Sequence, residues 1–192
     1  MKETPFYLAF DDYFRTDEPF HDKKRNIHIG EGCVIRPYSF IYNNCKIGEK
    51  VLFGHNVMVR EKTSIGNRVK IGTNAVIEGT CKIEDDVNIQ SNVFIPINTY
   101  IESGVFIGPN VCFTNDKYPP SIDYKNLRGA YIKSNAVICA NAIILPWVEI
   151  GKDTLIAAGS LVTKNVPDNK MAIGSPAKFV NKPKNYVYKM MK

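Results

Sequence analysis

Residues 29–54 read IGEGCVIRPYSFIYNNCKIGEKVLFG, and within them an apolar residue recurs at every sixth position from Ile29. The count continues without a miss to Phe113, breaks, and resumes at Ile132. The positions are Ile29, Ile35, Ile41, Ile47, Phe53, Val59, Ile65, Ile71, Ile77, Ile83, Ile89, Ile95, Ile101, Ile107 and Phe113, then Ile132, Ile138, Ile144, Ile150, Ile156 and Val162. A period of six fits neither a helix nor a simple alternating strand, so it indicates a repeated supersecondary unit.

Each unit has the pattern of a short strand followed by a turn. The position two before each counted residue is also apolar or small, so two side chains point inward with one outward residue between them. The residue after the counted one is often glycine, which favours a turn: Gly30, Gly48, Gly54, Gly66, Gly72, Gly108 and Gly151. Three units close one triangular coil, and coils stack at about 4.7–4.9 Å. The sequence therefore predicts an all-β parallel β-helix of about seven coils.

The repeat divides the chain into three segments and one insertion. Residues 1–26 do not fit the repeat, and we expect an irregular N-terminal cap, because the terminal coil of a solenoid would otherwise expose its core and an unpaired strand edge. Residues 27–166 form the predicted β-helix, interrupted by a polar loop at 114–131. Residues 167–192 form a short C-terminal tail, whose basic end at 179–192 suggests a cap or a short helix.

The composition limits the class of protein. A length of 192 residues suits one domain. No apolar run approaches the roughly 18–20 residues of a membrane span, and the N-terminus lacks the apolar region of a signal peptide, so we expect a cytoplasmic protein. Five cysteines lie outside CxxC spacing, so no metal site is predicted. The net charge of +6 favours an anionic partner such as a nucleotide; nucleic acid is not expected, because no motif for it occurs.

The hexapeptide pattern over residues 27–180 resembles that of the hexapeptide-repeat acyltransferases, whose fold is a left-handed parallel β-helix. The left hand is implied by this resemblance, since the general rule for parallel crossovers favours a right hand. Members of that family are typically homotrimers that hold acetyl-CoA in the groove between neighbouring prisms. The resemblance therefore implies a homotrimer with acetyl-CoA as co-substrate.

Two motifs narrow the resemblance to the nucleotide-sugar 3-N-acetyltransferases. They are VFIGPNVCFTNDKYP at 105–119 and IQSNV at 89–93. Such enzymes acetylate the 3-amino group of UDP- or dTDP-linked amino sugars for surface polysaccharides, so a nucleotide sugar is the implied acceptor. The chain departs from the pattern at Pro120, where those enzymes commonly have an arginine, and this leaves the sugar itself open.

We place the chemistry at the break in the repeat, because a long loop leaving a rigid scaffold is usually functional. If corners A, B and C follow Ile29, Ile35 and Ile41, Glu78 lies at corner C, on the side of the loop. Asn92 lies at corner B and could join the site across a subunit boundary. We expect side chains near the loop to hold the ammonium or hydroxyl groups of the sugar while backbone N–H groups bind the oxyanion. The candidate catalytic residues are Glu78, Asn92, Asn115 and Asp116.

Small residues dominate the turns after the loop, and they let backbone amides approach the amide chain of pantetheine. The resemblance further implies that lysines near the C-terminus meet the coenzyme phosphates, a role that suits a point charge. The candidate coenzyme-binding residues are Ser134, Ala140, Ala158, Lys164 and Lys178.

The three histidines, His21, His28 and His55, bear on the choice of acceptor. None is expected near the loop, and a hydroxyl acceptor needs a base, whereas an amine can attack while partly neutral. The sequence therefore favours N-acetyl transfer. A sugar or small-molecule O-acetyltransferase and a non-catalytic β-helix scaffold remain as alternatives. A zinc site like that of the γ-carbonic anhydrases needs three histidines at the trimer interface, and no suitable set is present.

Overall fold

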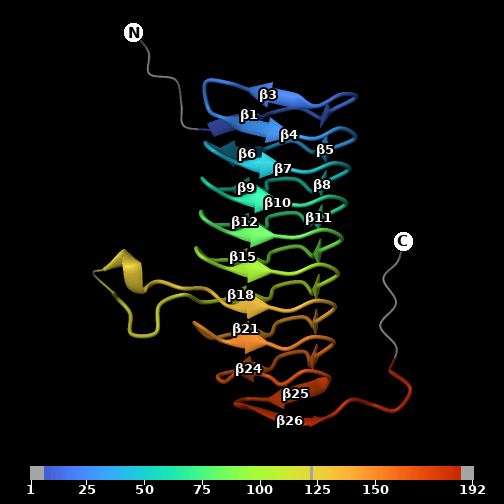
Figure 1. The fold of residues 1–192 in the computed structure, drawn as a ribbon, viewed down its shortest axis with the longest axis vertical. Helices are drawn as coiled ribbons and strands as arrows, with labels where there is room; N and C mark the ends of the chain where they lie inside the picture. Colours follow the sequence, from blue (N-terminus) through green and yellow to red (C-terminus); the bar gives the residue numbers. More distant parts are fainter. Residues whose placement is uncertain (1–6, 122, 187–192) are drawn as a thin grey trace.

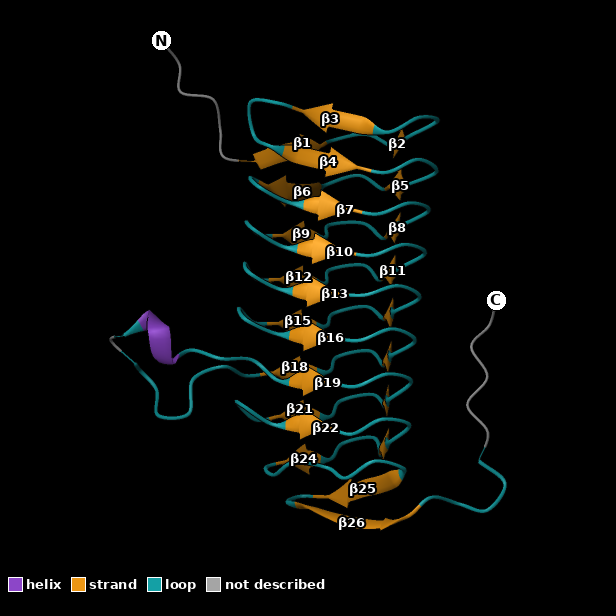
Figure 2. Cartoon of the chain, in the orientation of Figure 1, coloured by secondary structure: helices purple, strands orange, loops and turns teal. Residues whose placement is uncertain are grey.

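The computed structural model describes residues 7–121 and 123–186 and shows a prism of stacked coils with three sheets as its sides (Figures 1 and 2). The β4 sheet contains β3 (Phe20–Asp22), β4 (Ile27–Ile29), β7 (Lys46–Ile47), β10 (Ser64–Ile65), β13 (Lys82–Ile83), β16 (Tyr100–Ile101), β19 (Tyr131–Ile132) and β22 (Glu149–Ile150). The β5 sheet contains β2 (Phe14–Arg15), β5 (Val34–Ile35), β8 (Leu52–Phe53), β11 (Lys70–Ile71), β14 (Asn88–Ile89), β17 (Phe106–Ile107), β20 (Val137–Ile138), β23 (Leu155–Ile156), β25 (Lys170–Gly174) and β26 (Ala177–Asn181). The β6 sheet contains β1 (Tyr7–Phe10), β6 (Ser39–Tyr42), β9 (Met58–Val59), β12 (Val76–Ile77), β15 (Phe94–Ile95), β18 (Cys112–Phe113), β21 (Ile143–Ile144) and β24 (Leu161–Val162).

The prism winds with a left hand. In Figure 1, β4 runs to the right at the front, β5 lies at the right-hand side, β6 returns behind, and each following coil lies lower. In the described residues, the β4 and β6 sheets each hold seven parallel repeat strands and one antiparallel cap strand. The predicted all-β, left-handed parallel β-helix of about seven coils is therefore confirmed. No helix among residues 7–121 and 123–186 has the length and apolar character that crossing a bilayer requires.

The six-residue count becomes three columns of buried side chains along the axis. In the β4 sheet, Ile65 pairs with Ile47 on one side and Ile83 on the other, and all three are at most 2% exposed. The position two earlier also faces inward. Some of its small polar members bond to the next coil, whereas Thr99 and Thr154 bond within their own turns. The thiol of Cys33 donates to the carbonyl of Gly48 at 3.1 Å, and the Ser39 hydroxyl donates to Gly54 at 3.3 Å. These bonds explain why Ser, Thr and Cys alternate with Val at this position.

The turns require a left-handed backbone at the third residue after each counted one except Phe113 and Val162. Asn occupies this position most often, and Asn tolerates positive φ better than most residues. At corner B, the side chains of successive coils form a ladder: Asn56 donates to Asn74, Asn74 to Asn92, and Asn92 to Asn110, at 2.9–3.1 Å. The backbone N–H of each such residue bonds to a turn carbonyl of the preceding coil, as Asn92 does to Thr73 at 2.9 Å.

Both ends of the prism carry antiparallel strands. At the N-terminal end, β1, β2 and β3 each pair antiparallel with a strand of the first coil, so the cap is more regular than the sequence suggests. At the C-terminal end, β25 continues the β5 sheet and folds back through β26 as a hairpin. A strand therefore ends at Asn181 where the sequence suggested a cap or short helix from residue 179; residues 187–192 lie outside the described part.

The insertion leaves the prism at corner C, between β18 and β19, and carries one short 3-10 helix, η1 (Tyr124–Asn126) (Figure 1). The coils on either side stack without interruption: Cys112 and Phe113 pair with Ile143 and Ile144, and Tyr131 pairs with Tyr100. Tyr131 already belongs to β19, so the loop ends one residue before the predicted boundary.

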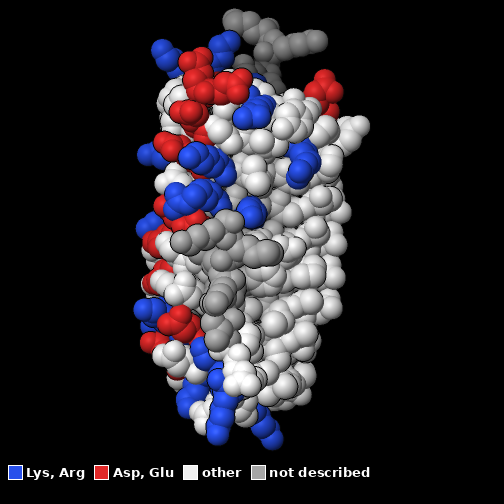
Figure 3. All heavy atoms as spheres, turned by 90° about the vertical axis from the view of Figure 1, so that its right-hand side faces the viewer, with Lys and Arg blue, Asp and Glu red and all other residues white. Residues whose placement is uncertain are grey.

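The outward faces of the β4 and β6 sheets differ in polarity. Outward residues of the β4 sheet are mostly polar or charged: His28, Lys46, Ser64, Lys82, Tyr100, Tyr131 and Glu149. Outward residues of the β6 sheet are apolar or sulfur-containing: Phe40, Met58, Val76, Phe94, Cys112, Ile143 and Leu161. Figure 3 shows the charges gathered along one side of the prism, with a broad uncharged surface beside them.

Candidate active site

The base of the inserted loop is tied to the coil beneath it. The side-chain amide of Asn98 donates to the carbonyl of Leu127 at 2.8 Å, and the N–H of Gly129 donates to the carbonyl of Ile97 at 3.2 Å. Gly129 is required there, because a Cβ would lie 2.0 Å from the hydroxyl oxygen of Thr99. The two ends of the loop also meet each other, since the Arg128 N–H donates to the carbonyl of Asn115 at 3.0 Å.

Asp116 holds the first part of the loop together. Its carboxylate accepts the Ser121 hydroxyl at 2.6 Å, the Ser121 N–H at 2.7 Å and the Tyr118 N–H at 3.0 Å. The hydrogen bond from the Ser121 side chain is the main reason that the pKa of Asp116 lies below its usual range. The carboxylate therefore stays ionised at neutral pH. Within the described residues, its hydrogen bonds fix the segment from 116 to 121.

Asn115 differs from its neighbour. Its carbonyl closes the base of the loop, while its half-buried side chain forms no hydrogen bond in the described part of the chain. An amide with a free carbonyl and two free N–H groups at the root of an ordered loop can accept from, or donate to, a ligand. Of the four predicted catalytic residues, Asn115 and Asp116 are thus together, and Asn115 is the one with free hydrogen-bonding groups.

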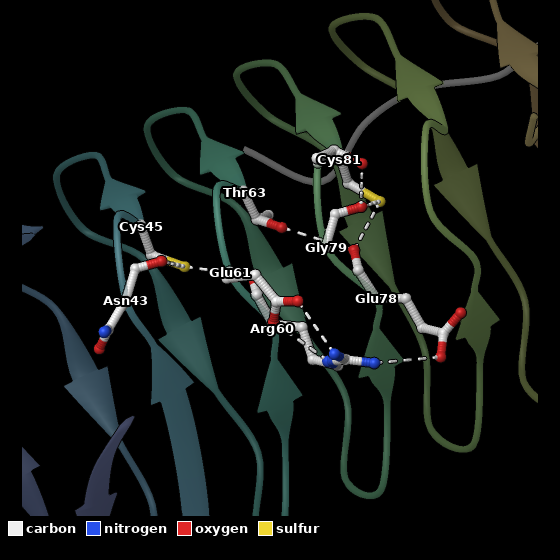
Figure 4. A network of polar contacts seen from close by, with 9 residues as sticks. Asn43, Cys45, Arg60, Glu61, Thr63, Glu78, Gly79 and Cys81 are labelled. Carbon is white, nitrogen blue, oxygen red and sulfur yellow. Dashed lines mark hydrogen bonds and ion pairs between the residues drawn. The ribbon is translucent and has the colours of Figure 1, made fainter. Parts of the chain in front are cut away.

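Glu78 lies at corner C as predicted, but its carboxylate is engaged elsewhere. It lies 3.8 Å from the guanidinium of Arg60 in the preceding coil, which also pairs with Glu61 at 2.9 Å (Figure 4). The loop leaves the prism two coils further on, about 10 Å away by strand spacing. No hydrogen bond joins Glu78 to the loop in the described residues, so the structure does not bring it together with Asp116.

Asn92 lies on a different corner from the loop. It adopts a φ of 60°, and its side chain both donates to Asn110 and accepts from Asn74 within the corner B ladder. The side-chain carbonyl and the NH2 group of Asn92 therefore both bond to neighbouring coils. Within one protomer, Asn92 is separate from Asn115 and Asp116.

The predicted coenzyme-binding residues fall into separate places. Ala140 and Ala158 are adjacent at corner B, where the N–H of Gly159 donates to the Ala140 carbonyl at 2.9 Å. Lys164 is exposed at corner C, and Lys178 is exposed on β26. No described carboxylate pairs with either lysine, so both charges are open to an anion. Only Ala140 and Ala158 form a continuous small-residue surface.

Ser134, the fifth of these residues, has a partner inside the protein. Its N–H and hydroxyl both donate to one carboxylate oxygen of Glu102, at 2.9 and 2.6 Å, and the phenol of Tyr131 donates to the other oxygen. Although partial burial raises it, these donors hold the pKa of Glu102 below its usual value. Glu84 receives the same set of bonds from Tyr100 and Ser103 one coil earlier. The arrangement is a repeated clasp between coils at corner A.

The three histidines and the buried thiols of Cys45 and Cys81 lie away from the loop. His21 and His28 contact each other on β3 and β4, with ring nitrogens 3.0 Å apart, at the N-terminal end. His55 lies exposed at corner B. Burial raises the pKa of Cys45 to about 11 and that of Cys81 to about 12, so both thiols stay protonated. Among the described residues, no group of three metal-ligating side chains occurs.

Sequence reasoning did not single out the aromatic residues beside the loop. Trp147, at corner C of the following coil, is 48% exposed, and Tyr118 on the loop is 77% exposed. The ammonium of Lys117 lies 5.6 Å from the Tyr118 ring centroid and 5.8 Å from the Trp147 ring centroid. One signal was available: Trp147 is the single tryptophan of the chain and stands at the turn position that asparagine usually fills.

A left-handed prism of hexapeptide coils with an ordered loop at one corner defines the class of hexapeptide β-helix proteins. The family model "Bacterial transferase hexapeptide (six repeats)" matches residues 26–61, 62–96 and 129–164, more than half of the chain. The chain therefore belongs to this family, and the predicted resemblance is confirmed.

Individual relatives match parts of the chain. Galactoside O-acetyltransferase of Lactococcus lactis subsp. lactis (strain IL1403) is 47% identical over 75 residues, which are 36% of this chain and 36% of that protein. The chain thus spans well under half the length of this curated relative. A crystal structure of a "putative acetyltransferase" from Bacillus cereus has a TM-score of 0.58 and 26% identity, covering 85% of this chain and 82% of that one.

A third relative shows the shared fold. A variant of AntD, an N-acyltransferase from Bacillus cereus in complex with dTDP-4-amino-4,6-dideoxyglucose and coenzyme A, has a TM-score of 0.51 and 22% identity. The match covers 78% of this chain and 79% of that one. At this identity the likeness supports the fold and not the substrate.

Proposed function

We propose that the protein transfers the acetyl group of acetyl-CoA to the amino group of a nucleotide-linked amino sugar, UDP- or dTDP-linked, in the cytoplasm. The observation that carries this proposal is the loop at corner C. It is anchored at its base, ordered by Asp116, carries the free amide of Asn115, and contains no histidine. An N-acyltransferase with the same fold, AntD, holds an amino sugar nucleotide and coenzyme A together.

The lack of a base at the loop favours an amine acceptor. Thioester aminolysis needs an unprotonated amine, an oxyanion site and a proton acceptor after attack, and solvent can serve as that acceptor. Asn115 can hold the amine or a neighbouring hydroxyl, and Asp116 keeps the loop in place beside it. We assign the oxyanion site to backbone N–H groups, which are common donors in acyl transfer, and leave the amide of Asn115 for the acceptor.

The proposed coenzyme site requires a second copy of the chain. The small-residue surface of Ala140 and Ala158 lies at corner B, whereas Asn115 lies at corner C. These two corners are the opposite edges of the apolar β6 sheet. In a homotrimer, corner B of one protomer can face corner C of its neighbour. The proposed coenzyme surface of one protomer then lies beside Asn115 of the next. The apolar and sulfur-containing outward row of the β6 sheet, which lies between these two corners, supports such packing, because apolar faces are typical of permanent interfaces.

The activity is tested with purified protein, acetyl-CoA and matched acceptors, by following the free thiol of released coenzyme A. We expect turnover with an amino sugar nucleotide and none with its hydroxyl counterpart. Asn115→Ala should lower kcat/KM by roughly two- to ten-fold, the effect of losing a hydrogen bond between neutral groups. Asp123→Asn, in the same loop, is the matched control and should keep the activity. Full activity of Asn115→Ala and Asp116→Asn would contradict this site.

A second candidate function is sugar O-acetylation, favoured by the 47% identity to galactoside O-acetyltransferase over 75 residues. It predicts turnover with the hydroxyl acceptor and a fall in rate when the pH drops through the pKa of a catalytic base. The same acceptor pair therefore decides between the two reactions. A scaffold without activity would turn over neither acceptor and would show no thermal shift with acetyl-CoA. Sedimentation of the protein tests the trimer independently of either reaction.

A further inference from the structure

Three side chains at corner C form a surface that the catalytic proposal does not use. Lys117 and Tyr118 belong to the inserted loop, and Trp147 belongs to the turn of the following coil. The ammonium of Lys117 lies over both rings, 5.6 Å from the Tyr118 centroid and 5.8 Å from the Trp147 centroid. We call Lys117, Tyr118 and Trp147 the corner C cluster. It lies directly beside the root of the loop at Asn115.

Trp147 adopts a backbone conformation that is unfavourable for a bulky residue. Its φ of 67° lies in the left-handed region, where bulky residues are rare. The equivalent corner C positions hold Asn44, Lys62, Thr80 and Asn98. The ring is 48% exposed, and the buried column beneath it is filled by Ile144 and Val148. Core packing therefore does not account for a tryptophan here, and its exposed ring face is left for a contact outside the protomer.

The loop holds the cluster in place before any ligand arrives. Asp116 accepts the N–H of Tyr118 and two donors of Ser121, which fixes the segment that carries Lys117 and Tyr118. Asn98 fixes the returning end of the loop through Leu127. A preorganised surface binds a ligand at lower entropic cost than a mobile one. No described carboxylate pairs with Lys117, so its charge is available to an anion.

We propose that the corner C cluster binds a nucleotide, with the base stacked on Trp147 or Tyr118 and a phosphate on Lys117. Aromatic rings stack on any base, and lysine binds phosphate as a point charge. Of the surfaces described, this is the one that pairs exposed aromatic rings with a free cation. The choice of nucleotides rests on the proposed function, which offers two sources of the same chemistry: coenzyme A and the nucleotide of the acceptor. A second copy of the chain is the rival occupant.

Trp147 is the only tryptophan in the chain, so its fluorescence reports on this cluster alone. Coenzyme A, UDP and dTDP are titrated separately into the purified protein. Saturable quenching by coenzyme A assigns the cluster to the coenzyme, and quenching by UDP or dTDP assigns it to the acceptor; either outcome supports the proposal. Emission that changes with none of them, or only on diluting the protein, overturns it and points to contact between copies.

Single substitutions in the corner C cluster test whether nucleotide binding can be weakened while the fold persists. Trp147→Asn places at this turn the residue that usually fills it, so the fold should persist. Because this variant has no tryptophan, its Kd for the assigned nucleotide is measured by titration calorimetry, and it should rise roughly ten-fold, the effect of one lost stacking contact. Lys117→Ala should weaken the quenching by several-fold. Tyr38→Asn is the matched control, because Tyr38 is also exposed with a φ of 67° but lies near the N-terminal end at corner B. Affinities unchanged in both Lys117→Ala and Trp147→Asn would refute the cluster.

This test and the test of activity can fail separately. Acetyl transfer to an amino sugar without nucleotide-dependent emission would keep the proposed function and remove the corner C cluster from it. Nucleotide-dependent emission without transfer to any acceptor would keep the nucleotide site and remove the proposed reaction.

Discussion

Two adjacent isoleucines on β21 test the inward and outward pattern on which the prism depends. Ile144 is 0% exposed and lies in the column between Phe113 and Val162, whereas Ile143 points outward and is 43% exposed. Ile144→Ala and Ile143→Ala make the same chemical change one residue apart. We expect Ile144→Ala to lower the free energy of unfolding far more than Ile143→Ala.

The magnitude follows from what each change removes. Ile→Ala deletes three carbon atoms, each worth about 0.8 kcal/mol when fully buried, and the cavity left among stacked coils raises the total to about 3–4 kcal/mol for Ile144. At Ile143 nearly half of the side chain is already in solvent and no closed cavity forms, so we expect about 1 kcal/mol. The difference should therefore exceed about 2 kcal/mol.

The measurement is chemical denaturation followed by far-UV circular dichroism at several protein concentrations. Varying the concentration separates folding from association, to which Ile143 contributes if the β6 sheet lies in an interface. Comparing midpoints and slopes shows whether the coils unfold together or in parts. Equal losses for the two variants, or a larger loss for Ile143→Ala once association is accounted for, would refute the register of β21.

Three further predictions address the turns and the N-terminal coil. Gly72→Ala should destabilise the fold by several kcal/mol, because its Cβ would lie 2.4 Å from backbone atoms of the next coil; Gly159→Ala, with open space and a φ of 68°, should cost only about 1 kcal/mol in thermal denaturation. Tyr38→Asn should raise the melting temperature, because asparagine tolerates the φ of 67° better by about 1 kcal/mol, and a lower melting temperature would show that the exposed ring contributes packing. Partial burial and the neighbouring His21 lower the pKa of His28 in the folded protein, so its contribution to stability is present above pH 6.5 and is lost as the pH falls through the folded pKa. The protection factors of the amides in β3 and β4, taken relative to the intrinsic exchange rate at each pH, should therefore fall on acidification in the wild type but much less in His28→Asn.

The fold was accessible from sequence because every coil repeats one local rule. The inward columns, the turns and the position of the loop all follow from counting in sixes, and Phe113 marks where the count fails. The handedness did not follow from the count and came from the resemblance. The antiparallel strands β1, β2 and β3 were not predicted, because their sequences have no repeat. They become strands by pairing with the strands of the first coil.

The site was less accessible because its contacts are between coils and depend on rotamers. Ser134 looked like a small turn residue, yet it binds Glu102, which lies 32 residues earlier in sequence. Asn92 looked like a substrate ligand, yet its amide belongs to a ladder whose members lie 18 residues apart. Asp116 was placed correctly in the loop, but its bonds to Ser121 could not be derived from spacing. The periodicity predicts the position of each residue on the prism, but it does not predict which partner the polar group of its side chain will contact.

The uninterrupted stacking across the insertion has a consequence for how this chain can change. Cys112 pairs with Ile143 and Tyr100 pairs with Tyr131 as if the intervening residues were absent, so the prism is indifferent to the length of what leaves corner C. Segments of other lengths can be exchanged there without shifting the register of any coil. Corner C can therefore carry a different surface segment while the stacked coils stay the same.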